Sequence, residues 1–289
     1  MTQSNMPGSA ADSSPLISPE CLHDWLADDS DVTVLDVRWS LTDGACRSAY
    51  ENGHIPSAQF IDLETELSAE PGTTGRHPLP APGVFVDAMR RAGINDTTAV
   101  VCYDAKTGSS AARAWWLLRY FGHEHVYVLD GGLAGWQRAG YRTVVPHPDA
   151  EPGNFSIRES RARTLEAPAV LGFAADHVLL DARDDERYRG DVEPVDAVAG
   201  HIPGAQSAPT KNNLADDGTF LPATELRRRF ERLGAGPGSN VATYCGSGVT
   251  AAHQILALEV AGIHAALYPG SWSEWITDPS RPTATGPLP

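Results

Sequence analysis

The chain carries one sequence pattern twice, in the same order in its two halves. Each copy has an apolar run ending in Asp-x-Arg, a Gly-His-Ile-Pro turn, a second β-branched run and a Gly-rich segment that leads to a tryptophan. Four matches in the same order do not arise by chance, so the sequence indicates a duplicated domain. The matched segments are 32–38, 53–59, 100–104 and 129–136 in the first half, and 177–183, 200–206, 241–245 and 268–275 in the second.

Each half alternates short β-branched runs with amphipathic helical stretches. This alternation predicts an α/β fold of two tandem domains, each with a mainly parallel sheet flanked by helices on both faces. The expected strands are 32–37, 99–103, 126–129, 178–181, 240–244 and 266–268. The expected helices are 19–27, 83–92, 110–121, 133–139, 223–233 and 250–261.

Shifts in composition suggest the domain boundaries. Residues 1–16 are polar and rich in Ser, Gly and Ala, which predicts a disordered tail. The first domain is expected over residues 17–141 and the second over residues 164–289. The segment 142–163 carries prolines amid polar residues and is the expected linker.

Cys245 is the residue that most directly suggests a chemistry. It follows an apolar run, is followed by Gly246-Ser247-Gly248, and precedes an alanine-rich helical pattern. Backbone N–H groups in such a loop converge on one point, and the helix N-terminus adds partial positive charge there. Both effects favour thiolate over thiol, so the loop predicts covalent catalysis at sulfur.

A cysteine at a strand end is also commonly a small buried hydrophobic residue without reactivity. The repeat supplies an internal comparison, because the first half has Asp104 where the second has Cys245. A carboxylate cannot accept a sulfur atom as a thiolate does. We therefore place the active centre in the C-terminal half, facing a pocket shared with the N-terminal half. The alternative is two binding domains with an incidental cysteine.

The formal net charge of -15 disfavours nucleic acid and anionic membrane surfaces as partners. The sequence has no apolar run near the roughly 18 residues of a membrane span, and its start does not resemble a secretion signal. The four cysteines lie far apart, with no CxxC pair and no zinc-site spacing. We therefore expect a cytoplasmic protein with a reactive thiol.

Three segments carry a family resemblance: the repeated Gly-His-Ile-Pro-x-Ala signature, the loop Cys-Gly-Ser-Gly-Val-Thr at 245–250, and Gly-Ser-Trp-Ser-Glu-Trp at 270–275. They resemble the tandem-domain rhodanese superfamily, and more narrowly its 3-mercaptopyruvate and thiosulfate sulfurtransferases, of the type that actinobacteria carry. The resemblance covers residues 17–278, which is nearly the whole chain.

The resemblance implies two α/β domains, of which the C-terminal one is active, and a persulfide intermediate on Cys245. A small-molecule sulfur donor passes one sulfur atom to the cysteine, and the persulfide gives it to cyanide, a thiol or thioredoxin. The resemblance implies neither a metal nor an organic cofactor. The terminal sulfur needs N–H donors and no bulky neighbour. The loop residues implied in donor binding are Gly246, Gly248, Val249 and Thr250.

The resemblance also implies a proton-relay group. The loop lacks the cationic side chains of thiosulfate-preferring relatives and so looks like the mercaptopyruvate type. Ser247 would then polarise the donor carbonyl or relay a proton, in a pair with His77 and an acid from the N-terminal domain. We take Asp62 as that acid, with Glu64 as the alternative.

Arg187 matches the family's donor-binding arginine, since a guanidinium grips a carboxylate with two hydrogen bonds. The alternative is a surface arginine that balances the acidic side chains beside it. The mercaptopyruvate enzymes carry a second arginine further along, and the matching position here is Asp196. This departure leaves the preferred donor open, with Arg183 or Arg113 as a candidate replacement cation.

Two other function classes fit parts of the pattern. A phosphatase with a loop cysteine would need one more loop residue and a closing arginine, whereas positions 251 and 252 are both alanine. A non-enzymatic persulfide carrier that docks on partner proteins is compatible with the paired domains. His54 and His201 occur in both halves alike, so we interpret both as structural residues.

Overall fold

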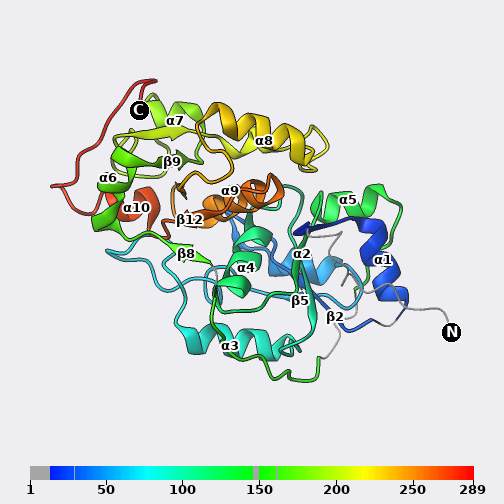
Figure 1. Cartoon of the computed structure of the whole chain (residues 1–289). Helices are drawn as coiled ribbons and strands as arrows, with labels where there is room; N and C mark the ends of the chain where they lie inside the picture. Colours follow the sequence, from blue (N-terminus) through cyan, green and yellow to red (C-terminus); the bar gives the residue numbers. More distant parts are fainter. Residues whose placement is uncertain (1–13, 29, 146–149, 161) are drawn as a thin grey trace.

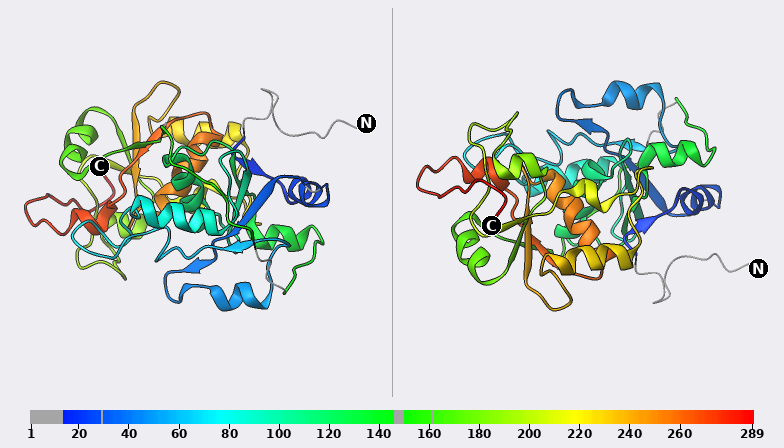
Figure 2. Two further views of the ribbon diagram at one scale, coloured as in Figure 1. Left: turned by 90° about the horizontal axis from the view of Figure 1, so that it is seen from below. Right: turned by 90° about the horizontal axis from the view of Figure 1, so that it is seen from above.

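The structure is a computed structural model that describes residues 14–28, 30–145, 150–160 and 162–289. The expected disordered tail lies outside the described residues up to position 13, and Leu16 already belongs to the first strand. The two views of Figure 2 place the N-terminal and C-terminal halves of the chain on two sides of the molecule.

The described residues form one five-stranded parallel sheet in each half, as expected. The first sheet has the strand order β1-β7-β6-β2-β5, and the second, read from the matching edge, has the order β8-β12-β11-β9-β10. The duplicated sequence therefore folds into one topology used twice. The strands are β1 (Leu16–Ile17), β2 (Val32–Asp36), β5 (Gln59–Phe60), β6 (Ala99–Tyr103), β7 (Val126–Leu129), β8 (Arg163–Thr164), β9 (Val178–Asp181), β10 (Ala205–Ser207), β11 (Val241–Tyr244) and β12 (Ala265–Leu267), with a small antiparallel hairpin of β3 (Trp39–Ser40) and β4 (Gly44–Ala45).

Helices cover both faces of each sheet (Figure 1). The first of them shows why the local sequence is helical, because Ser18 Oγ accepts the Cys21 N–H at 3.2 Å and Pro19 occupies the first helical position. The helices are α1 (Pro19–Ala27), α2 (Arg47–Asn52), α3 (Pro82–Arg91), α4 (Ser109–Tyr120), α5 (Gly132–Arg138), α6 (Ala167–Asp176), α7 (Asp185–Arg189), α8 (Ala223–Arg232), α9 (Val249–Val260) and α10 (Ser271–Trp275), with a 3-10 turn η1 (Thr210–Asn213).

The twelve predicted strands and helices are all present, with ends shifted by about one residue. The elements that the sequence patterns missed are mostly short ones at sheet edges and beside loops. Two or three residues are too few to show a period of two, so the edge strands carry no signal of their own.

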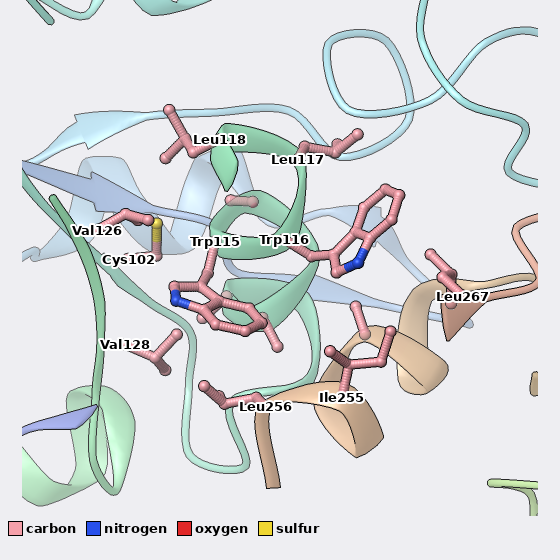
Figure 3. Close-up of a cluster of buried hydrophobic side chains, with 14 of the residues drawn as sticks. Cys102, Trp115, Trp116, Leu117, Leu118, Val126, Val128, Ile255, Leu256 and Leu267 are labelled. Carbon is pink, nitrogen blue, oxygen red and sulfur yellow. The ribbon is translucent and has the colours of Figure 1, made fainter. Parts of the chain in front are cut away.

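Helices α4 and α9 join the two domains. Both are buried on nearly every side, which is why their sequences are rich in alanine and large apolar residues all round rather than on one stripe. Trp115 of α4 lies toward Leu256 of α9, and Trp116 and Ile255 belong to the same buried cluster (Figure 3). One apolar core thus continues from one domain into the other and fixes their relative position.

The described part of the expected linker packs on the N-terminal domain. The Gly153 N–H donates to the Arg90 carbonyl at 2.8 Å, and the Phe155 N–H donates to the Ile94 carbonyl at 3.0 Å. Phe155 itself is buried. The segment therefore follows the surface of the first domain before it enters β8.

The Asp-x-Arg element of the repeat forms a buried ion pair in each domain. Arg38 binds Asp36 through Nε (3.0 Å) and Nη2 (2.7 Å), and Arg183 binds Asp181 through Nε (3.0 Å) and Nη2 (2.6 Å). The same Nη2 group in each domain also donates to the carbonyl of the glycine that opens the Gly-His-Ile-Pro turn. Each pair therefore holds that turn against the sheet. Arg183, which we named as a candidate replacement cation, uses its guanidinium for this contact.

The two histidines of the repeated turn also have matching contacts. The Nδ1 atom of His54 lies 2.9 Å from the Tyr50 carbonyl oxygen, and that of His201 lies 2.8 Å from the Tyr188 carbonyl oxygen. Each imidazole stacks on the ring of the same tyrosine. Identical contacts in both domains agree with the structural interpretation of these histidines.

Among the described residues, no helix combines the length and apolar character needed to cross a membrane.

Replacing Asp181 with alanine should lower the free energy of unfolding by about 3 kcal/mol, because the buried Arg183 guanidinium loses its two-point partner and keeps only Glu193, at 3.4 Å. Urea unfolding followed by circular dichroism measures the effect. Asp191→Ala, which removes the exposed partner of Arg189, is the control and should change the stability little. Equal stabilities for the two variants would contradict this role of the buried pair.

Candidate active site

Cys245 lies directly after β11, at the carboxyl edge of the second sheet, and opens the loop that leads into α9. Its side chain is almost buried, with 2% of its surface exposed. The Gly248 N–H donates to Cys245 Sγ at 3.1 Å. This N–H belongs to the helix cap, so the sulfur lies at the positive end of α9.

The matching loop of the N-terminal domain holds an acceptor in the same way. The Asp104 carboxylate accepts the N–H groups of Lys106 (3.0 Å), Gly108 (2.9 Å) and Ser110 (3.1 Å). Gly108 caps α4 as Gly248 caps α9, with φ of 77° and 82°. Because N–H groups can only donate, this loop geometry is a cradle for an electron-rich group, and the two domains fill it with different ones.

The loop requires glycine at two positions for different reasons. Gly248 has a positive φ, and a Cβ atom there would collide with the carbonyl oxygen of Pro269. A Cβ atom on Gly246 would lie 2.9 Å from Arg76 Nη2. The loop is therefore packed tightly on the side of the second sheet and approached by a guanidinium on the other side.

The segment after β12 fixes the backbone of the loop. Ser271 Oγ accepts the Cys245 N–H at 3.1 Å, and the Trp272 N–H donates to the Cys245 carbonyl at 3.0 Å. Ser271 has a positive φ of 56°, which is rare outside glycine. Sequence reasoning missed Ser271, although it lies in the Gly-Ser-Trp-Ser-Glu-Trp motif. Trp272 is fully buried and lies against the Arg183 guanidinium, so it is a packing residue.

The N-terminal domain supplies a histidine to the loop. His77 Nδ1 lies 2.7 Å from Ser247 Oγ, and its Nε2 lies 3.3 Å from Glu64 Oε2. Glu64 is held in turn by the Trp39 indole N–H, which donates to Oε1 at 2.6 Å. Ser247, His77 and Glu64 thus form a chain of polar contacts that crosses from one domain to the other.

The structure corrects the choice of acid. Asp62 Oδ1 accepts the backbone N–H groups of Glu64 (2.9 Å) and Thr65 (3.3 Å), so this carboxylate closes its own turn. Glu64, two residues further along, is the acid that reaches His77. Glu64, the alternative that we named, is therefore the carboxylate in contact with His77, whereas Asp62 is engaged in its own turn.

Burial lowers the pKa of His77, and the nearby Arg113 and Arg76 lower it further, while Glu64 acts in the opposite direction. The net effect keeps the imidazole neutral at physiological pH. With Nε2–H directed to Glu64, the lone pair on Nδ1 accepts the Ser247 hydroxyl hydrogen.

Arg113 is a fully buried cation behind the loop. It donates to the carbonyl oxygens of Leu67 (3.2 Å), His77 (3.0 Å) and Gly248 (3.4 Å). Burial lowers its pKa to about 10, so it remains charged at neutral pH, and negative charge on Cys245 favours that charged form. Arg113 therefore ties the histidine segment to the cysteine loop, and its burial excludes it as the missing donor-binding cation.

Arg187 lies near the end of α7, beside the loop. Its Nη2 atom donates to Glu193 (2.7 Å) and Asp196 (2.9 Å), while Nη1 lies 3.6 Å from the position of a Cβ atom on Gly246. Asp196 also pairs with Arg76 of the other domain. Sequence reasoning missed Arg76, and its place directly before His77 was the available signal. Val249 and Thr250, which we expected in the donor site, form the first turn of α9.

Comparison with known families decides the identity of this arrangement. The family model for the rhodanese-like domain matches the chain twice, over residues 18–139 and 166–278. The chain belongs to the rhodanese family. The two matches coincide with the two sheets, so it is a tandem-domain rhodanese protein, as the sequence resemblance predicted.

Similar curated proteins carry the names of sulfurtransferases. The chain is 47% identical over 264 residues to a Pseudomonas aeruginosa protein named "Probable 3-mercaptopyruvate sulfurtransferase", covering 89% of this chain and 93% of the relative. It is 45% identical over 259 residues to a Mycobacterium tuberculosis protein named "Putative thiosulfate sulfurtransferase SseB", covering 88% of this chain and 91% of the relative. The two names give different sulfur donors.

A solved structure shares the fold. The crystal structure of a 3-mercaptopyruvate sulfurtransferase from Escherichia coli matches with a TM-score of 0.79 and 33% identity, over 90% of this chain and 100% of that chain. This rhodanese-family protein is thus an enzyme of the sulfurtransferase class. Among the described residues, no group of three or more His, Cys, Asp or Glu side chains is arranged to hold a metal ion.

The rhodanese site makes a prediction that needs no enzyme assay. The pKa of His77 should lie below the ordinary histidine value, and Glu64→Gln should lower it further, because it removes the negative charge that favours imidazolium. An NMR pH titration measures both values, with His77→Gln to assign the signal. A rise in the Glu64→Gln variant would contradict the contact between His77 and Glu64.

Proposed function

We propose that this sulfurtransferase moves one sulfur atom from 3-mercaptopyruvate, or from thiosulfate, to a thiophilic acceptor through a persulfide on Cys245. The observation that carries the proposal is the contact of the Gly248 N–H with Cys245 Sγ, in a loop whose counterpart cradles the Asp104 carboxylate. Such a cradle stabilises a negative sulfur before transfer and a persulfide after it.

The first half-reaction loads the cysteine. The Cys245 thiolate attacks the donor sulfur, an S–S bond forms, and the C–S bond of 3-mercaptopyruvate breaks. The electron pair of that bond leaves on carbon as pyruvate enolate. The enolate takes up the proton that the donor thiol loses and becomes pyruvate, and the persulfide remains as an anion. With thiosulfate, the bond between its two sulfur atoms breaks instead, and sulfite leaves with the electron pair without needing a proton.

The contacts of Ser247 support 3-mercaptopyruvate as the donor. A departing enolate needs a proton, and the Ser247 hydroxyl, in contact with His77 and through it with Glu64, is placed to pass on the proton that the donor thiol releases. The same hydroxyl polarises the donor carbonyl before the bond breaks. Departing sulfite has no use for this group.

The second half-reaction empties the cysteine. A nucleophilic acceptor attacks the outer sulfur, the S–S bond breaks, and the electron pair returns to Cys245 as thiolate. Cyanide, a small thiol and thioredoxin are the acceptors that we propose. All four cysteines lie in the described part of the chain and none of them forms a disulfide there, which supports a reducing compartment, the cytoplasm.

A non-enzymatic persulfide carrier is the weaker alternative. The relatives of this protein carry the names of transferases. A carrier, in addition, has no need of a proton-relay group beside its sulfur. A carrier would load once and then stall, whereas the enzyme turns over with small donors and acceptors.

Cys245→Ser should abolish sulfur transfer and leave the fold intact, because only the nucleophile changes. Thiocyanate formation from donor and cyanide measures activity, and intact mass measures the persulfide. Wild-type protein incubated with donor alone should gain the mass of one sulfur atom, which cyanide then removes. Full activity in the Cys245→Ser variant would refute the proposal.

Ser247→Ala should separate the two donors. Turnover of 3-mercaptopyruvate should fall by about 10²-fold, since the proton donor for the enolate is lost, while turnover of thiosulfate should change little. The ratio of kcat/KM values for the two donors is the measurement. An equal loss for both donors would mean that Ser247 supports the loop rather than the proton transfer.

A further inference from the structure

Arg76 belongs to the N-terminal domain but is held against the C-terminal one. Its backbone N–H donates to Ser273 Oγ at 3.0 Å, in the helix that follows β12. Its guanidinium pairs through Nη1 with Asp196. These two contacts place an arginine from one domain over the cysteine loop of the other.

Asp196 joins this arginine to Arg187. The carboxylate pairs with Arg76 through Oδ1 and accepts a hydrogen bond from Arg187 Nη2 to Oδ2 at 2.9 Å. The Asp196 side chain is only 4% exposed, so solvent screens these pairs weakly. The position where the mercaptopyruvate pattern has a second arginine therefore holds a carboxylate that positions one from elsewhere in the chain.

The two guanidinium groups converge on the residue next to Cys245. Arg76 Nη2 lies 2.9 Å, and Arg187 Nη1 lies 3.6 Å, from the position of a Cβ atom on Gly246. A Cβ there would obstruct both groups, and glycine leaves that space open.

Arg76 also has unused hydrogen-bonding capacity. A guanidinium carries five N–H donors, and buried donors in proteins normally have partners. The Arg76 Nε atom is buried and finds no hydrogen-bond partner among the described residues. The protein therefore leaves this guanidinium incompletely hydrogen-bonded, and its Nη2 group faces the cysteine loop.

We propose that Arg76 and Arg187 together bind the anionic group of the sulfur donor, so that the second donor-binding cation of this enzyme comes from the N-terminal domain. The inference rests on the proposed function and names the residue that completes its donor site. Two guanidinium groups suit a carboxylate, whose two oxygens each accept a charge-assisted hydrogen bond.

The charges around the pair favour a donor with one negative charge. Glu193 and Asp196 already offset the positive charges of Arg187 and Arg76. A single carboxylate, as in 3-mercaptopyruvate, needs directed N–H donors rather than a large excess of positive charge. Thiosulfate is a dianion and gains less from a neutralised pair.

Three variants of the full-length protein test the proposal. Arg76→Gln removes the cation, Asp196→Asn removes the carboxylate that pairs with it, and Arg138→Gln removes an ion pair with Asp217 that joins the domains elsewhere. Steady-state KM and kcat for both donors, with cyanide as acceptor, are the measurements. Arg76→Lys is a second substitution at the site that keeps the charge but not the fork of donors.

Arg76→Gln should raise the KM for 3-mercaptopyruvate about tenfold or more, the loss expected for a charge-assisted hydrogen bond. Arg76→Lys should restore part of the loss, and Arg138→Gln should leave KM unchanged. Asp196→Asn should lower the KM for thiosulfate, because it removes a negative charge from the site that binds this dianion.

Two results would overturn the inference. An unchanged KM in Arg76→Gln would exclude Arg76 from donor binding. Equal increases in the KM for thiosulfate in Arg76→Gln and Asp196→Asn would show that the pair only ties the domains together. Both results are distinct from failure of the proposed function, which would appear as wild-type protein that gains no sulfur on Cys245 when incubated with donor.

Discussion

A strand that turns sharply into a helix presents N–H groups that the helix itself cannot satisfy, and this constraint governs both halves of the molecule. In the N-terminal domain the Asp104 carboxylate fills the loop with its own oxygens. In the C-terminal domain the Cys245 sulfur occupies the matching position and accepts the Gly248 N–H. The same backbone geometry therefore holds a carboxylate in one domain and the proposed nucleophile in the other.

Neither domain completes the site alone. The sulfur, its cradle and Ser247 come from the C-terminal domain, whereas His77 and Glu64 come from the N-terminal domain. Contacts near 3 Å between the two sets require that the domains keep a fixed relation, and the continuous core between α4 and α9 provides it. The N-terminal domain thus has Asp104 where the other domain has Cys245, and it supplies the polar partners of the cysteine loop.

The sequence predicted the parts of this molecule that have a repeating signal. The central strands and long helices appear as patterns of several residues, and the duplication shows the contrast between Cys245 and Asp104 in the amino-acid sequence itself. The acid partner of His77 was out of reach, because Asp62 and Glu64 are two residues apart and only the turn geometry decides which carboxylate points to the loop. The pairing of Arg76 with Asp196 was equally out of reach, since it depends on how two distant segments meet across the domains.

The near-complete burial of Cys245 has a consequence for chemical labelling. Cys21 lies at the surface, whereas the Cys245 sulfur belongs to a residue with only 2% of its surface open to solvent. Exposure alone therefore favours alkylation of Cys21 over Cys245. In this protein, the thiol that is easiest to reach is not the proposed nucleophile.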